Sequence, residues 1–182
     1  KTALLIEGAR RVGKSTLVEE FGRNEYASCL IVDFFQAPAE VRQYFEDYRT
    51  DFDTLFLYLS TYYGVDLHER DTLIVFDEVQ MFPTARGLLK YLVADGRYDY
   101  IETGSLLSIK QNVDGIVVPS EEESFELNPL DFEEFLWGMG EEKLVTLIRR
   151  QFDSLKPLPD GLHRRAMGLL REYILVGGMP GP

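Results

Sequence analysis

The chain has 182 residues, of which 45% are hydrophobic and 27% are charged. This length fits one domain with a small appendage, and the composition excludes a disordered or fibrous chain. Its 31 acidic residues outnumber its 19 basic ones, giving a net charge of −12, which disfavours general coating of nucleic acid. The longest apolar runs have the length of strands, so no membrane-spanning helix is expected.

Cysteine and histidine are scarce in this sequence. Cys29 is the one cysteine, so no internal disulfide is possible, and with only two histidines no zinc cluster is expected. This usage is typical of a protein of the reducing cytoplasm. The chain begins at Lys1 within an apolar run. We therefore expect it to be a segment trimmed from a longer protein.

Short apolar runs alternate with helical patterns along the chain. The runs predicted to be strands are 3–6, 30–34, 73–77, 100–103 and 125–130. The predicted helices are 14–21, 38–48, 51–62, 84–94, 131–137, 141–152 and 162–176. Gly22 and Gly96 are expected to end helices, and Asp51 or Asp53 to cap one. The acidic stretch that opens at Glu121 is expected to be solvated.

This alternation indicates an α/β fold with a parallel five-stranded sheet that is covered by helices on both faces. After Trp137 the patterns are helical only. The sequence therefore predicts a core at residues 1–137 and a small helical lid subdomain at 138–182.

Residues 8–15 match the full Walker A pattern, between a predicted strand and a predicted helix. Glycines let backbone N–H groups surround a phosphate, and the helix N-terminus adds its positive end. Lys14, expected to be exposed, would contact the β- and γ-phosphates, and the Ser15 hydroxyl would bind Mg²⁺. Arg10 and Arg11 would either lean toward the γ-phosphate or stay solvated. The residues predicted to bind nucleotide here are Gly8, Ala9, Arg10, Arg11, Val12, Gly13, Lys14, Ser15 and Thr16.

Two acids follow the third predicted strand, in the Walker B arrangement. Asp77 would hold Mg²⁺ together with Ser15, and Glu78 would act as general base on the attacking water. The second acid and the lack of a base-reading Asn/Thr-Lys-x-Asp segment disfavour small-molecule kinases and GTPases. These residues indicate a P-loop ATPase.

Thr103-Gly104-Ser105 closes the fourth predicted strand, which would lie between the first and third. A hydroxyl there would lie beside Glu78 and could orient the water, with Ser105 favoured over Thr103 as a further catalytic residue. The alternative is an ordinary glycine-containing turn.

Five segments, taken in order, resemble one known family. They are residues 8–15, Asp77-Glu78-Val79-Gln80, 103–107, 128–137 and 173–180. They are similar to bacterial and archaeal AAA-type ATPases, related to the STAND NTPases, that carry a C-terminal domain of unknown function. The resemblance implies binding of ATP and Mg²⁺, a core sheet with a helical lid, and a further domain beyond Pro182.

The resemblance also bears on the lid. Gly177-Gly178-Met179-Pro180 lies where STAND relatives place a turn against the adenine, so Met179 and Pro180 are candidate nucleotide contacts. The alternative is a helix stop followed by a turn. One of the lid arginines could reach the γ-phosphate on closure, while most are expected to be surface charges. The candidates are Arg149, Arg150, Arg164, Arg165 and Arg171.

Ring-forming AAA+ proteins place an arginine between the sensing strand and the next strand. Between Ser105 and Leu130 this chain has only Lys110 as a basic residue. A ring with shared active sites is therefore not expected, although Arg86 or Arg97 could substitute.

We expect a Mg²⁺-dependent ATPase that uses its nucleotide state as a conformational switch. Two alternatives stay open: a nucleotide-gated protein-binding module with negligible turnover, and a DNA-linked ATPase. The expected partners are ATP and an unidentified protein client, with DNA only through a region missing here and no membrane. The oligomeric state is left open.

Overall fold

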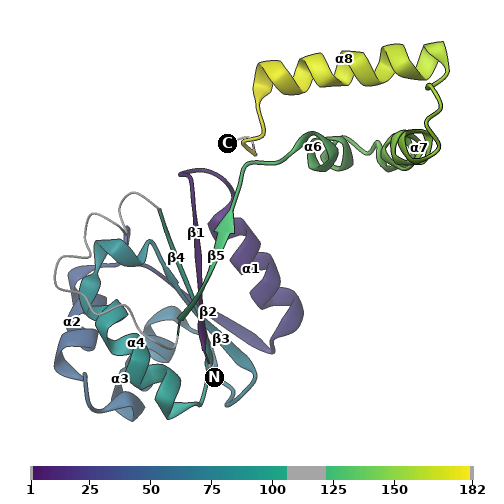
Figure 1. Cartoon of the computed structure of the whole chain (residues 1–182). Helices are drawn as coiled ribbons and strands as arrows, with labels where there is room; N and C mark the ends of the chain where they lie inside the picture. Colours follow the sequence, from purple (N-terminus) through teal and green to yellow (C-terminus); the bar gives the residue numbers. More distant parts are fainter. Residues whose placement is uncertain (1, 106–121, 181–182) are drawn as a thin grey trace. The chain divides into compact units, whose positions relative to one another are not determined.

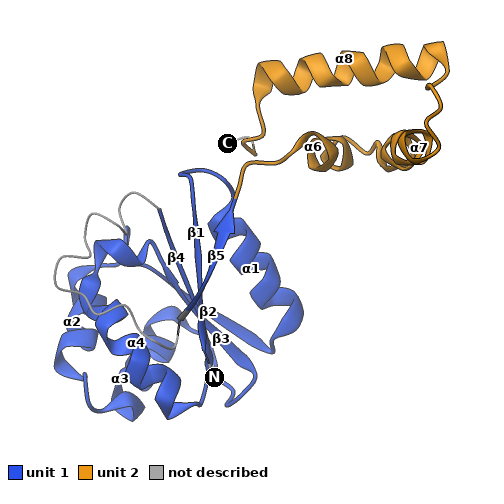
Figure 2. Cartoon of the chain, in the orientation of Figure 1, with its two compact units in different colours: residues 1–127 blue, residues 128–182 orange. Residues whose placement is uncertain are grey.

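The computed structural model describes residues 2–105 and 122–180, and the chain divides into two compact units, residues 1–127 and 128–182 (Figure 2). The first unit contains a five-stranded parallel sheet with the strand order β2-β3-β4-β1-β5. The strands are β1 (Ala3–Gly8), β2 (Ser28–Asp33), β3 (Thr72–Asp77), β4 (Asp99–Ser105) and β5 (Glu122–Leu127). The predicted α/β fold with a five-stranded parallel sheet is thus confirmed.

Helices cover both faces of this sheet, as predicted (Figure 1). The helical elements of the first unit are α1 (Lys14–Glu25), α2 (Ala39–Asp47), α3 (Phe52–Tyr63), the 3₁₀ turn η1 (Val79–Met81) and α4 (Pro83–Asp95). Helix α1 lies on one face, and α2, α3 and α4 lie on the other (Figure 1). Crossovers between parallel strands are right-handed, so the face that a helix covers depends on the direction in which the chain moves along the sheet, and the chain moves one way from β1 to β2 and the other way from β2 to β3 and β4.

The two faces of the sheet bury separate clusters of side chains. Leu73 and Val75 pack in one cluster with Val18 of α1. Ile74 and Phe76, the alternate residues of the same strand, belong to the larger cluster under α2, α3 and α4. Every residue of β3 is buried. A strand buried on both faces has to be apolar at successive positions, which explains the run that predicted it.

The helix ends of the first unit confirm two predicted boundaries and overturn one. Asp51 caps α3 by accepting a hydrogen bond from the Thr54 N–H at 3.1 Å, and Gly96, with φ of 77°, ends α4. Gly22 does not end α1, which continues to Glu25. A Cβ on Gly22 would lie 2.4 Å from the Cys29 sulfur, so this glycine allows α1 to approach β2. The prediction mistook a packing glycine for a helix stop.

The fifth strand begins and ends three residues before the predicted run 125–130. It pairs with β1 alone, as an edge strand, and carries several acids. The solvated acidic stretch expected from Glu121 onward is therefore a strand over residues 122–127, while Glu121 lies outside the described residues. Edge strands tolerate charged side chains because one of their sides is open to water.

The second unit is helical. Its helices are α6 (Phe132–Gly138), α7 (Glu142–Asp153) and α8 (Asp160–Val176). Asp131 and Glu134 form a reciprocal capping box at the start of α6. In the described parts of the chain, no helix is long and apolar enough to cross a membrane. The division into a core at 1–137 and a lid at 138–182 stays a prediction.

Two distant segments of the second unit are joined where α8 ends. The Leu130 N–H donates to the Gly178 carbonyl at 2.8 Å, and the Tyr173 hydroxyl donates to the Leu130 carbonyl at 2.9 Å. A Cβ on Gly178 would lie 2.0 Å from the Leu130 oxygen. This contact links segments 128–137 and 173–180, the last two of the five that carry the family resemblance.

Candidate active site

The loops that follow β1 and β3 meet at one edge of the sheet. Strand β4 lies between β1 and β3, as predicted, with Gly8 opposite Ser105. A cavity of about 340 Å³ opens at this edge. Its lining includes Ser15, Asp77, Glu78 and Ser105, together with Arg10. The structure thus brings these five predicted site residues around one cavity, at the strand ends where open parallel sheets bind ligands, while Lys14 is not among the lining residues.

The loop between β1 and α1 depends on its two glycines. A Cβ on Gly8 would lie 2.3 Å from the Leu127 oxygen, so a larger residue would displace β5 from β1. Gly13 has φ of 99°, in the region that favours glycine, and Arg11 also has a positive φ of 66°. Both Arg10 and Arg11 are exposed, and Arg10 reaches the cavity. This curled backbone leads directly into the N-terminus of α1 at Lys14.

Lys14 is buried rather than exposed, contrary to expectation, with 5% of its surface accessible. Its ammonium donates to the carbonyls of Gly8 at 3.2 Å and Ala9 at 2.9 Å, so it lies inside the curl of the loop. Burial lowers its pKa, while the nearby charges of Glu78 and Asp77 act in the opposite direction. Charge-assisted hydrogen bonds from an ammonium to an anion are stronger than those between neutral groups.

The two acids at the end of β3 share one hydroxyl from the neighbouring strand. Thr103 of β4 donates to the Asp77 carboxylate and accepts from the Glu78 N–H, the latter at 3.2 Å. Asp77 and Thr103 are both buried. Thr103 therefore holds the acid pair, while Ser105 lines the cavity. The role of Ser105 in catalysis stays a prediction.

Two further residues line this cavity that had no role predicted from the sequence. Gln80, in η1, donates from its amide to the Glu78 carboxylate. Asp33 ends β2, lines the cavity and accepts from the Phe35 N–H at 2.8 Å. Gln80 belongs to segment 77–80, one of the five that carry the family resemblance, and this was the signal in the sequence that could have identified it. Asp33 could have been noticed as an acid that ends a strand of the same sheet.

The donor set at the cavity suits a hard divalent cation. The Ser15 hydroxyl and the Asp77 carboxylate both supply oxygen, which Mg²⁺ prefers. Within residues 2–105 and 122–180, no three His, Cys, Asp or Glu side chains cluster closely enough to hold a metal alone. Mg²⁺ commonly takes one or two protein ligands together with the phosphate oxygens of a substrate.

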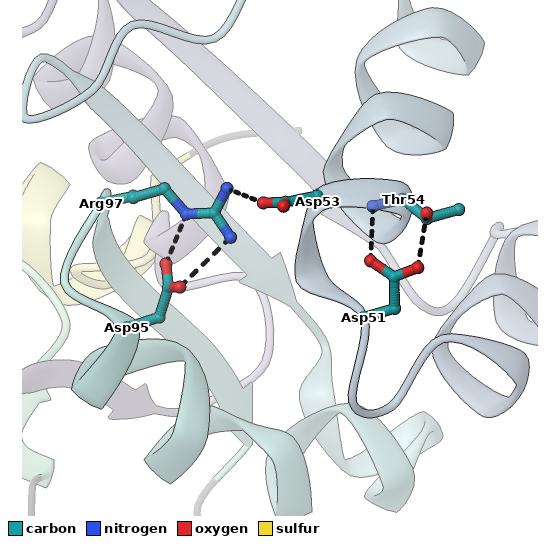
Figure 3. A network of polar contacts seen from close by, with 5 residues as sticks. All are labelled: Asp51, Asp53, Thr54, Asp95 and Arg97. Carbon is teal, nitrogen blue, oxygen red and sulfur yellow. Dashed lines mark hydrogen bonds and ion pairs between the residues drawn. The ribbon is translucent and has the colours of Figure 1, made fainter.

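Arg86 and Arg97, which could substitute for the arginine that ring-forming AAA+ proteins place after the sensing strand, form ion pairs with other residues. Arg97 pairs with Asp95 at 2.7 Å and with Asp53 at 2.5 Å, beside the Asp51 cap of α3 (Figure 3). The hydrogen bond to Asp95 is the main cause that raises the pKa of Arg97. Arg86 is buried and pairs with Glu102 at 3.7 Å.

The structure shows ion pairs for some of the other basic residues that the sequence offered as candidates. Two lid arginines form exposed ion pairs within the second unit, Arg149 with Glu133 and Arg165 with Glu141. Lys110 lies outside the described residues. Met179 and Pro180 belong to the second unit, and their contact with nucleotide stays a prediction.

A family model described as an AAA domain matches residues 1–136. The chain belongs to this AAA domain family. The match covers the whole sheet, the loop between β1 and α1, and the acid pair. The P-loop fold predicted from the Walker motifs is therefore confirmed. No match is found among the curated proteins.

Several solved structures are similar to this chain at low sequence identity. The Aeropyrum pernix ORC1 protein in complex with DNA is 15% identical, with a TM-score of 0.49 over 78% of this chain and 44% of its own. Drosophila ORC bound to AT-rich DNA and Cdc6 is 13% identical, with a TM-score of 0.46 over 97% and 70%. Closed-state Hsp104 with ATPγS and casein is 14% identical, with a TM-score of 0.47 over 79% and 28%. The chain thus spans less than half the length of the first and third of these proteins.

Proposed function

We propose that this chain binds ATP with Mg²⁺ at the cavity of its first unit and hydrolyses it. The observation that carries the proposal is that Ser15 and the Asp77–Glu78 pair line one cavity, with the buried Lys14 next to Ser15 in the chain and close enough to both acids for their charges to act on it. P-loop NTPases use a lysine in the loop after one strand to bind the phosphates, and an acid at the end of a nearby strand to hold Mg²⁺. Membership of the AAA domain family supports nucleotide-dependent ATPase activity.

Each residue has a distinct part in the proposed reaction. Loop amides and Lys14 bind the phosphates, and Ser15 with Asp77 would hold Mg²⁺. When bound, Mg²⁺ would neutralise charge on the phosphate oxygens. Glu78 accepts a proton from water as that water attacks the γ-phosphorus, and the bond to the β-phosphate oxygen breaks to give ADP and phosphate.

Asp77→Asn tests the metal part of this proposal. Asparagine has the same shape and its side-chain oxygen can still accept from Thr103, so the fold should persist. Because the anionic ligand is lost, Mg²⁺ should no longer strengthen ATP binding in calorimetric titrations with and without Mg²⁺. Asp66→Asn, the same change at an exposed loop position, is the control and should bind like the wild type. Full Mg²⁺ enhancement in Asp77→Asn would contradict the assignment.

We also propose that residues 138–182 act as a lid whose position follows the nucleotide, with Met179 and Pro180 contacting the adenine. Gly138 is the last residue of α6, and Gly140 lies in the link before α7 with φ of 73°, which suits a hinge. ATP can shift the lid only as far as its affinity differs between the two positions.

Spin labels can test this lid movement. One label would be placed at Lys90 on α4 and one at Glu172 on α8, both exposed, in a Cys29→Ser background. The distribution of distances between the labels should shift toward one population when Mg·ATP is added. An unchanged distribution would contradict the switch and leave ATP binding and hydrolysis standing.

A further inference from the structure

Gln80 contacts the residue that we propose as the general base. Its amide Nε2 lies 2.5 Å from Oε2 of Glu78, and both side chains line the cavity. The orientation of this amide follows from charge, because the reverse orientation would place the Gln80 oxygen against a carboxylate. In the described part of the chain, Gln80 Oε1 is buried and has no hydrogen-bond partner. The contact with Glu78 is therefore the interaction that orients this amide.

The main chain of Glu78 is fixed independently of Gln80. Its N–H donates to Thr103 at 3.2 Å, and its carbonyl accepts from the Met81 N–H at 2.9 Å. Its φ of 54° and ψ of 45° lie in the left-handed region, which costs a residue other than glycine some conformational energy. A backbone held in this unfavourable conformation directs the side chain toward the cavity.

The carboxylate of Glu78 ends a flexible stem of two methylene groups. Fixing the backbone leaves the rotations of this stem free, and holding them costs side-chain entropy. The hydrogen bond from Gln80 occupies one carboxylate oxygen, Oε2, and so restrains the stem. The second oxygen, Oε1, is then presented in one direction.

We infer that Gln80 is a positioning residue for the hydrolysis of ATP: it holds Glu78 so that Oε1 is directed to accept the proton of the attacking water. This inference rests on the proposed function, since it names the residue that orients the base of that reaction. Gln80 acts through Glu78 and needs no contact with ATP. Its loss should therefore lower kcat and leave the affinity for Mg·ATP unchanged.

Gln80→Met in the full chain removes the amide and keeps the length of the side chain. The rate of phosphate release at saturating ATP should fall about tenfold, because misdirected catalytic groups commonly cost one to two orders of magnitude. The dissociation constant for Mg·ATP should stay within twofold of the wild-type value. Gln43→Met is the matched control, since Gln43 makes the same amide-to-carboxylate contact with Asp47 on the exposed side of α2. It should leave both quantities unchanged.

Glu78→Gln provides the background that separates positioning from a structural role. If Gln80 acts only through the carboxylate of Glu78, adding Gln80→Met to Glu78→Gln should cause no further loss of kcat. An equal tenfold loss in both backgrounds would overturn the inference, as would wild-type kcat in Gln80→Met. If Gln80→Met fails to fold, Gln80→Leu, which also removes the amide and adds no charge, should show the same loss of kcat and carries the same test.

The failure of the inference and that of the proposed function give different results. If Glu78→Gln lowers turnover while Gln80→Met does not, only the positioning role is wrong. If the wild-type chain releases no phosphate, or if Glu78→Gln is as active as the wild type, the proposed function fails and the inference fails with it.

Discussion

The two units of the chain bury their apolar side chains to very different degrees. In the described residues, the buried hydrophobic side chains of the second unit are Leu136, Leu144, Val145 and Ala166, while the first unit contains all the others. At the end of α8, by contrast, Leu175 is 84% exposed. Because burial of apolar surface is the main source of stability, the first unit is expected to be the rigid one. The proposed catalytic groups are fixed on that unit, whereas the proposed lid belongs to the weakly packed one.

The largest expected effect is the loss of unfolding free energy when a leucine is shortened in the first unit, compared with the same change in the second unit. Leu30 of β2 is completely buried, so Leu30→Ala should lower the free energy of unfolding by about 2–5 kcal/mol. Leu175→Ala makes the same chemical change at an exposed site and should change it by no more than about 0.5 kcal/mol. Urea denaturation followed by circular dichroism measures both variants. Equal losses would show that the second unit packs more tightly than its exposed side chains indicate.

A second prediction concerns the charge inside the phosphate-binding loop. Lys14→Met keeps the buried stem and removes the ammonium, so ATP should bind more weakly by on the order of 10- to 100-fold. Lys90→Met, at an exposed position on α4, should bind ATP as the wild type does. Calorimetric titration gives both constants. If Lys14→Met kept wild-type affinity, the phosphates would have to bind elsewhere.

The smallest effect concerns the close contact within the second unit. Gly178→Ala would place a Cβ 2.0 Å from the Leu130 oxygen, and the displacement should cost about 1–3 kcal/mol. Gly168→Ala lies within α8, where a Cβ meets nothing within 4 Å, and should instead stabilise the helix by about 0.5–1 kcal/mol. Thermal melting distinguishes the two variants, because the melting temperature should fall in Gly178→Ala and rise in Gly168→Ala. A neutral Gly178→Ala would show that the contact between Leu130 and the end of α8 yields easily.

Local signals in the sequence predicted much of the fold. Apolar runs located β1 to β4, and Asp51 and Gly96 marked the ends of α3 and α4 because capping depends on a few neighbouring residues. The Walker patterns placed Lys14, Asp77 and Glu78 near one another, since all parallel strands end at the same edge of the sheet.

What the sequence missed depends on contacts between distant residues. Gly22 looks like a helix stop, but its packing against Cys29 is a property of the assembled layers. Whether Thr103 or Ser105 contacts the acid pair depends on the register of β3 with β4, in which Phe76 lies opposite Glu102. The burial of Lys14 and the contact between Gln80 and Glu78 likewise depend on how the loops fold over the sheet. Periodicity and motif spacing carry no information on these contacts.

The central claim is that the acid pair of the first unit hydrolyses ATP, and the most direct test is phosphate release by the whole chain. The wild type should release phosphate from ATP when Mg²⁺ is present. Glu78→Gln keeps the shape of the side chain but removes the base, so it should bind ATP with unchanged affinity and turn over more slowly by on the order of 10²-fold or more. Equal rates for the two proteins, or no release by the wild type, would contradict the account.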